Sequence, residues 1–167
     1  CDWSSDVCSS DLTGEGLFVL DSRSESTLPI GAEVSIDGTL VLRRQALTVV
    51  LAAAPTLVTI DGGSLAPAES VAAPGFGAWA WERWEGRRVR VRGVLSGAPG
   101  ELSGGALDLK LRLADGEYVA VGVGVQNRAT IPSAVTGSGA QVVVTGIIHQ
   151  RGGSAGGGYR LWVDEMA

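Results

Sequence analysis

The stretch GRRVRVRG, residues 86–93, alternates arginine with valine between two glycines. Alternation with period two is typical of a β-strand that buries one of its faces. The valines would then point into a core, while Arg88, Arg90 and Arg92 point outward. A glycine at the end of such a run suits a bulge or sharp bend, where a strand curls around a small barrel. The stretch therefore predicts one strand of a small β-barrel.

The pattern G-x-x-V-x-V-x-G occurs in two further octets. GAQVVVTG at residues 139–146 matches it fully, and GAEVSIDG at residues 31–38 differs only in Ile36. A chain with 25 glycines produces some matches by chance. Three copies at strand-like sites nevertheless favour a repeated structural unit.

Five strands are predicted from residue 86 onward, at residues 88–95, 106–113, 118–125, 140–149 and 159–164. Between the second and third strands, the Asp-Gly pair at residues 115–116 is a hairpin signal. Residues 126–138 allow a loop or one helical turn, and residues 152–158 are a glycine-rich loop. Five strands with an insertion between the third and fourth is the order of an OB-fold, a five-stranded Greek-key barrel. The segment resembles that fold over about 80 residues.

The earlier part of the chain resembles the back half of a second copy. Residues 14–21, 31–42 and 46–52 would be its third, fourth and fifth strands. The chain is thus expected to be all-β, with a truncated OB-like module, a linker and a complete OB-like module. The boundaries expected for these parts are residues 13–64, 65–83 and 84–167.

This arrangement resembles the tandem OB-like modules of large secreted multidomain bacterial proteins. The resemblance implies an accessory module whose partners include the other domains of a parent protein. It also implies an extracellular or cell-surface location.

Residues 1–12, CDWSSDVCSSDL, resemble the translation of a common sequencing adapter. We therefore interpret them as an artefact and leave them out of the fold prediction. The alternative is a genuine tail with a Cys1/Cys8 pair. Without this segment the sequence has no cysteine, and so offers neither a thiol nucleophile nor a cysteine-based metal site.

Charge is distributed unevenly along the chain, whose formal net charge is −5. Residues 86–167 hold nine basic and six acidic side chains, whereas residues 13–85 hold four basic and nine acidic ones. On the predicted strand 106–113, Lys110 and Arg112 point outward beside Asp108. Because the first two strands of an OB-fold are neighbours, we expect five cations and one carboxylate on one outer face.

OB-folds bind oligonucleotides or oligosaccharides on this face and its adjoining loops. We therefore predict a non-catalytic binding module with weak, sequence-independent affinity for single-stranded nucleic acid or another polyanion. The candidate binding residues are Arg88, Arg90, Arg92, Lys110, Arg112, Tyr118 and Arg151. The alternative is a solvated strand face with cross-strand charge pairs, in a structural spacer or a carbohydrate- or protein-contact module.

The segment AWAWERW, residues 78–84, holds three tryptophans. Exposed tryptophans would stack on sugars or bases, or would contact a protein. We favour the other interpretation, in which they pack where a linker enters the domain and cover the open end of the barrel.

No residue set indicates an enzyme, a cofactor or a metal site. His149 is the sole histidine and has no second ligand, so a polar strand end explains it best. Nothing in the spacing sets a pair of carboxylates across a cleft, as acid–base catalysis requires. The longest uncharged apolar run, residues 46–60, contains Pro55 and is too short to span a membrane.

Overall fold

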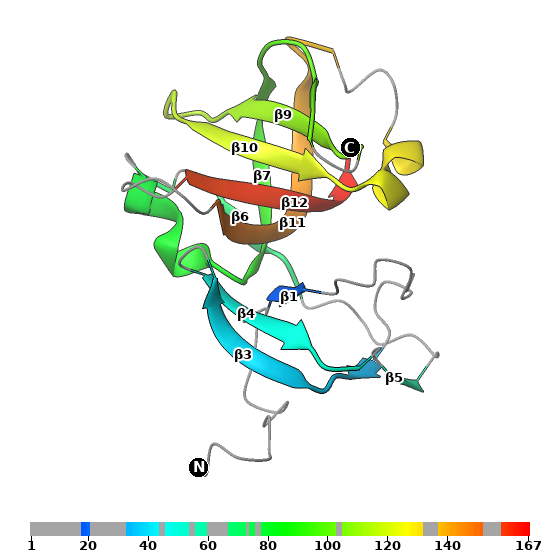
Figure 1. The fold of residues 1–167 in the computed structure, drawn as a ribbon. Helices are drawn as coiled ribbons and strands as arrows, with labels where there is room; N and C mark the ends of the chain where they lie inside the picture. Colours follow the sequence, from blue (N-terminus) through cyan, green and yellow to red (C-terminus); the bar gives the residue numbers. More distant parts are fainter. Residues whose placement is uncertain are drawn as a thin grey trace.

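The computed structural model of the chain describes residues 18–20, 33–43, 46–53, 56–59, 67–72, 74–75, 78–102, 105–131, 137–151 and 158–167. The predicted artefact at residues 1–12 and most of the glycine-rich loop lie outside this described part. The fold is all-β, as predicted (Figure 1). Its strands are β1 Phe18–Leu20, β2 Glu33–Ser35, β3 Gly38–Arg43, β4 Ala46–Leu51, β5 Thr56–Thr59, β6 Glu69–Val71, β7 Arg88–Leu95, β8 Gly100–Glu101, β9 Leu107–Arg112, β10 Tyr118–Val123, β11 Gln141–Arg151 and β12 Gly158–Met166. Two 3₁₀-helices, η1 Ala78–Trp84 and η2 Val125–Thr130, complete the described elements.

The C-terminal half forms a closed five-stranded barrel in the order β7-β11-β12-β10-β9, with β9 pairing back onto β7. The pairing of β10 with β12 is parallel, and the other four contacts are antiparallel. This is the strand order of an OB-fold. The predicted strands agree with the observed ones to within two residues at each end.

The barrel core consists of the inward residues that the alternation predicts. Val89 and Val91 are fully buried and alternate with exposed Arg90 and Arg92, and Leu111 of β9, the cross-strand partner of Leu95, is fully buried as well. These residues belong to one cluster of buried side chains that runs through all five barrel strands.

The glycines that end the repeated octets lie where another strand crosses closely. A Cβ atom added at Gly93 would lie 2.5 Å from the Arg112 carbonyl oxygen, and one at Gly146 would lie 2.0 Å from the Trp162 carbonyl oxygen. The register of β11 against β12 also shifts between Thr145 and Gly146, as in a β-bulge. In these two octets the final glycine therefore lies within a strand, at a close backbone crossing.

Two elements within the predicted linker pack onto the barrel. Strand β6 pairs in parallel with the first half of β7, and its Val71 joins the core. Trp81 of η1 is 5% exposed and also belongs to the core, with Trp84 packed against it. The prediction that the tryptophan segment covers the barrel is confirmed for these two residues. The side chain of Trp79 lies outside the described part, and the domain boundary at residue 84 stays a prediction.

The N-terminal strands form two small sheets. β4 pairs in parallel with β1 and antiparallel with β3, which matches the way β12 pairs with β10 and β11. The predicted single strand at residues 31–42 is wrong, because the chain leaves the strand at Ile36 and Asp37 and separates β2 from β3. β2 pairs instead with β5, and Val34 is exposed. The assignment of this region to a truncated module stays a prediction.

Candidate functional site

On the outer surface of the barrel, three charged side chains of β9 lie next to one aromatic and two small residues of β10. The cross-strand pairs are Arg112 with Tyr118, Lys110 with Ala120, and Asp108 with Gly122. We call these six residues the β9–β10 face. Ala120 is half-buried and has a small side chain, so a ligand can approach the sheet closely there, whereas Gly122 is buried.

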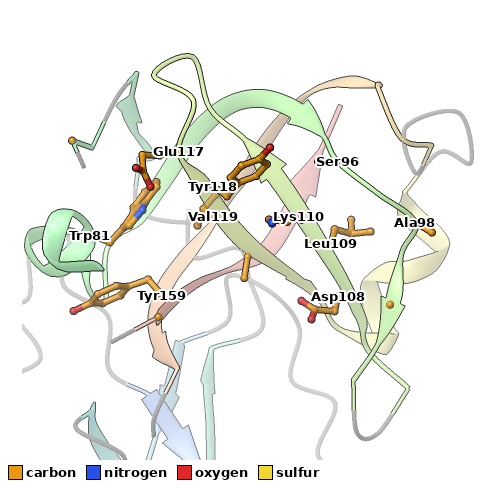
Figure 2. Close-up of a pocket in the computed structure, with 14 residues that line it drawn as sticks. Trp81, Ser96, Ala98, Asp108, Leu109, Lys110, Glu117, Tyr118, Val119 and Tyr159 are labelled. Atoms are coloured by element: carbon orange, nitrogen blue, oxygen red, sulfur yellow. The ribbon is translucent and has the colours of Figure 1, made fainter. Parts of the chain in front are cut away.

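A hollow of about 540 Å³ opens on this face (Figure 2). Lys110 and Tyr118 line it from the face, and Trp81 and Tyr159 line it to one side of them. Ser96 and Ala98, from the loop after β7, and Gly100 of β8 also line it. The hollow therefore combines aromatic walls with one cation, Lys110, and two carboxylate residues, Asp108 and Glu117, and ligand sites commonly have such a mixture of aromatic and polar lining.

Tyr118 and Lys110 form a cation–π pair at the centre of the face. The Tyr118 side chain is 44% exposed, and the Lys110 Nζ atom lies 4.2 Å from the centroid of its ring. Such a contact holds the ammonium group over the ring without neutralising its charge. The pair presents an aromatic surface and a positive charge side by side.

The other end of the face is fixed by an ion pair and a second aromatic ring. Arg160 of β12 donates to Asp108 at 3.1 Å, and its guanidinium lies 5.5 Å from the centroid of the Trp162 ring. A Cβ atom at Gly122 would lie 2.8 Å from that ring, so Trp162 packs directly across the glycine. Asp108 is thereby neutralised, and Lys110 and Arg112 set the charge of the rest of the face.

Tyr159 is held in place at the wall of the hollow. Its hydroxyl donates a hydrogen bond to the Glu82 carboxylate, and the residue is buried. Burial, and then the hydrogen bond to Glu82, raise the pKa of Tyr159 well above its ordinary range. The phenol therefore stays protonated and keeps donating to Glu82.

The arginine row divides between two places, because β7 pairs with β9 only through Val94 and Leu95. Arg88 and Arg90 lie over β11 and have protein partners. Arg88 Nε is 2.7 Å from Asp164 Oδ2, and Arg90 Nε is 3.5 Å from Thr145 Oγ1. The expected single face of five cations is therefore not formed.

Arg92 lies instead with Arg112, at a second hollow of about 370 Å³. Gln141, at the start of β11, lines the same hollow. Arg151 ends β11, and its side chain lies outside the described part. Of the seven predicted binding residues, Lys110 and Tyr118 line the first hollow, and Arg92 and Arg112 line the second.

The alternation that placed the cations does not identify the walls of the first hollow. Trp81 was expected to pack only, yet it also lines the hollow. The alternation also does not predict Tyr159, which lines the hollow, or Arg160 and Trp162, which contact the β9–β10 face, although the run YRLW at residues 159–162 holds two aromatic residues and one arginine. The presence of two aromatic residues and an arginine within four consecutive positions is the signal that could have indicated them.

His149 and the acidic side chains are the metal-ligand types among the described residues. No cluster of three or more His, Cys, Asp or Glu residues is arranged there to hold a metal ion. His149 is half-buried, and burial lowers its pKa. No helix within the described ranges is long and apolar enough to cross a membrane.

Comparison with protein-family models and with curated proteins finds no match. Among solved structures, a small single-stranded DNA-binding protein from Streptomyces coelicolor aligns over 48% of this chain and 91% of its own, with 15% identity and a TM-score of 0.38. The N-terminal domain of PriB from Thermoanaerobacter tencongensis aligns over 48% and 92%, with 11% identity and a TM-score of 0.34. A mutant of TiaS in complex with agmatine aligns over 49% of this chain, with 16% identity and a TM-score of 0.37, but the match covers only 21% of TiaS.

These likenesses are distant and concern the fold. The chain is an all-β protein with an OB-like barrel.

Proposed function

We propose that the barrel is a non-catalytic module that binds single-stranded nucleic acid weakly and without sequence preference. The observation that carries the proposal is the exposed Tyr118 ring, with Lys110 stacked on it and Arg112 directly across the strand pair. Proteins that bind single strands in this way combine aromatic platforms for bases with cations for phosphates. Every base has a flat π-face, so such binding needs no particular sequence.

The shape of the face supports the same proposal. From Tyr118 to Gly122, β10 extends about 13 Å. Tyr118 provides an aromatic ring at one end of this stretch, and only the small residues Ala120 and Gly122 follow it on this side of the strand. Trp162, half-buried, provides the second ring at the Gly122 end. Asp108 is paired with Arg160, so its carboxylate repels a phosphate less than a free one would.

The resemblance to tandem modules of secreted bacterial proteins supports a finer proposal. The barrel would then act as an accessory part of a larger protein, next to domains that carry other functions.

Titration of a fluorescently labelled oligothymidine with the full chain tests the proposal. Anisotropy should show binding at low salt, and the affinity should fall with a log–log salt slope of about −1.4 for two phosphates neutralised. Tyr118→Ala should weaken binding about 5- to 150-fold, because stacking on one aromatic side chain contributes about 1–3 kcal/mol.

Arg87→Gln is the matched control for charge. Arg87 lies before β7 and pairs with Glu69 in an exposed ion pair at 3.2 Å, away from the face. It should leave the affinity nearly unchanged, whereas Lys110→Gln should lower both the affinity and the slope. An equal loss in both variants would mean that net charge alone attracts the strand.

A structural spacer is the second candidate. Arg87 and Arg88 pair with Glu69 and Asp164, so part of the arginine row already serves internal contacts. If the wild-type chain binds no oligonucleotide at low salt, the spacer function replaces the proposed one.

A further inference from the structure

Three barrel strands meet at the second hollow. Val94 of β7 pairs on one side with Arg112 of β9 and on the other with Gln141 of β11. Arg92 lies two residues earlier on the same outward side of β7. The hollow has a volume of about 370 Å³, and its remaining lining comes from Gly93, Leu113, Ala114 and Gly116.

No carboxylate lines this hollow, although two guanidinium groups do. Asp115 lies in the adjoining turn, where one carboxylate oxygen accepts a hydrogen bond from the Glu117 backbone N–H and the other is buried. Like charges that share a site repel each other, and a bound anion removes that repulsion.

The two guanidiniums also differ from the other cations in their contacts. Arg88 and Arg160 pair with carboxylates, and Lys110 stacks on a ring. Arg90 and Arg128 donate to a hydroxyl and to a backbone carbonyl, respectively. Within the described ranges, the side chains of Arg92 and Arg112 make no hydrogen bond, ion pair or ring contact with another residue. Their donors are available to a ligand.

We propose that the Arg92–Arg112 hollow is a binding site for a phosphate group, in particular the terminal phosphate of a nucleic-acid strand. Guanidinium groups bind phosphate oxygens through pairs of parallel N–H donors, and the Gln141 amide adds a further donor. A phosphate monoester carries a charge of about −1.5 to −2 at pH 7, which matches two cations better than the single charge of an internal diester. Inorganic phosphate has the same chemistry and would occupy the same site.

The choice of a strand end rests on the proposed function. Arg112 belongs to the β9–β10 face, directly opposite Tyr118, and also lines the second hollow. A strand whose last base stacks on Tyr118 would place its terminal phosphate next to Arg112. The hollow's affinity for phosphate itself does not depend on Tyr118.

Binding of three short oligothymidines to the full chain tests the proposal: one with hydroxyl groups at both ends, one with a 5′-phosphate and one with a 3′-phosphate. One phosphorylated form should bind about five- to tenfold more tightly than the hydroxyl form at equal salt, the size expected for charge-assisted hydrogen bonds at an accessible site. Arg92→Gln should abolish that gain, and any loss of affinity for the hydroxyl form should be no larger than the loss in Arg90→Gln. Arg92→Lys, which keeps the charge but not the paired donors, should retain part of it.

Arg90→Gln is the matched control, because it removes the same charge from the next outward position of β7. It should preserve the gain from the terminal phosphate, and circular dichroism should show that all variants are folded. In a parallel titration with inorganic phosphate against chloride at equal ionic strength, NMR signals of the Arg92 and Arg112 side chains should shift in the wild type.

The outcomes separate the two proposals. If the hydroxyl form does not bind but inorganic phosphate shifts the two arginines, the proposed function fails while the phosphate site stands, with free phosphate as its ligand. If the hydroxyl form binds but no terminal phosphate adds affinity and phosphate shifts neither arginine, the phosphate site is refuted. Loss of the gain in Arg90→Gln as well as in Arg92→Gln also refutes it, because general charge would then explain the effect.

Discussion

Replacing Trp81 by alanine should destabilise the barrel by about 3–5 kcal/mol. Trp81 is 5% exposed and belongs to the core cluster, although it lies on η1, before the first barrel strand. An aromatic side chain that buries about 200 Å² contributes about 5 kcal/mol through the area removed from water. Because Trp81 also lines the first hollow, water can enter the space left by the indole, so we expect a value near the lower end.

Urea unfolding followed by far-UV circular dichroism measures this loss without relying on tryptophan fluorescence. The midpoint should fall while the m-value stays constant, as for a change in stability alone. Val125→Ala is the control, because Val125 is 54% exposed on the other 3₁₀-helix and should change stability by less than about 0.5 kcal/mol. A loss below about 1 kcal/mol for Trp81→Ala would refute the conclusion that η1 closes the core.

Two further predictions concern the barrel. Gly146→Ala should destabilise the protein by about 1–3 kcal/mol or more in urea unfolding, because its Cβ would lie 2.0 Å from the Trp162 carbonyl oxygen. Gly137 has open space around it, so Gly137→Ala should have little effect. Equal losses of stability in the two variants would contradict the close crossing at Gly146. Burial, and then the charge of Glu82, raise the pKa of Glu85 above its ordinary value of 4.5. The folded state therefore binds the proton of the Glu85 carboxyl more tightly than the unfolded state does. The stability that this protonation contributes is lost as the pH rises through the raised pKa. Glu85→Gln should therefore gain stability relative to the wild type between pH 4 and pH 7, and a difference that stays constant or shrinks over this range would contradict the raised pKa.

The five barrel strands were predictable because each has a regular alternation that determines which side chains are buried. The same reasoning missed β6 and β8, which have three and two residues and are too short to show a period. It also failed at residues 31–38, where the octet pattern is present but Val34 is exposed and the strand breaks. A local pattern does not show whether a neighbouring strand will cover it.

The candidate site was predictable only in part for a related reason. Alternation shows that Arg88, Arg90 and Arg92 face outward, but not which strand lies beside each of them. The Arg88–Asp164 ion pair joins residues 76 positions apart and depends on the order of β7, β11 and β12 around the barrel. Likewise, Arg92 and Arg112 share a hollow only because the edge of β7 that faces away from β11 pairs with β6 at residues 89–91 and then with β9 at residues 94–95.

Strand β6 affects how two copies of this chain can associate. It pairs with Val89 to Val91 through only three residues, along a stretch of β7 that β9 does not reach. If β6 detaches, that stretch exposes unpaired backbone donors and acceptors, which are a template for a strand from another molecule. The β6 segment of a second chain has the same sequence and fits the same register, so detachment at high concentration favours reciprocal strand exchange and dimers over random aggregation.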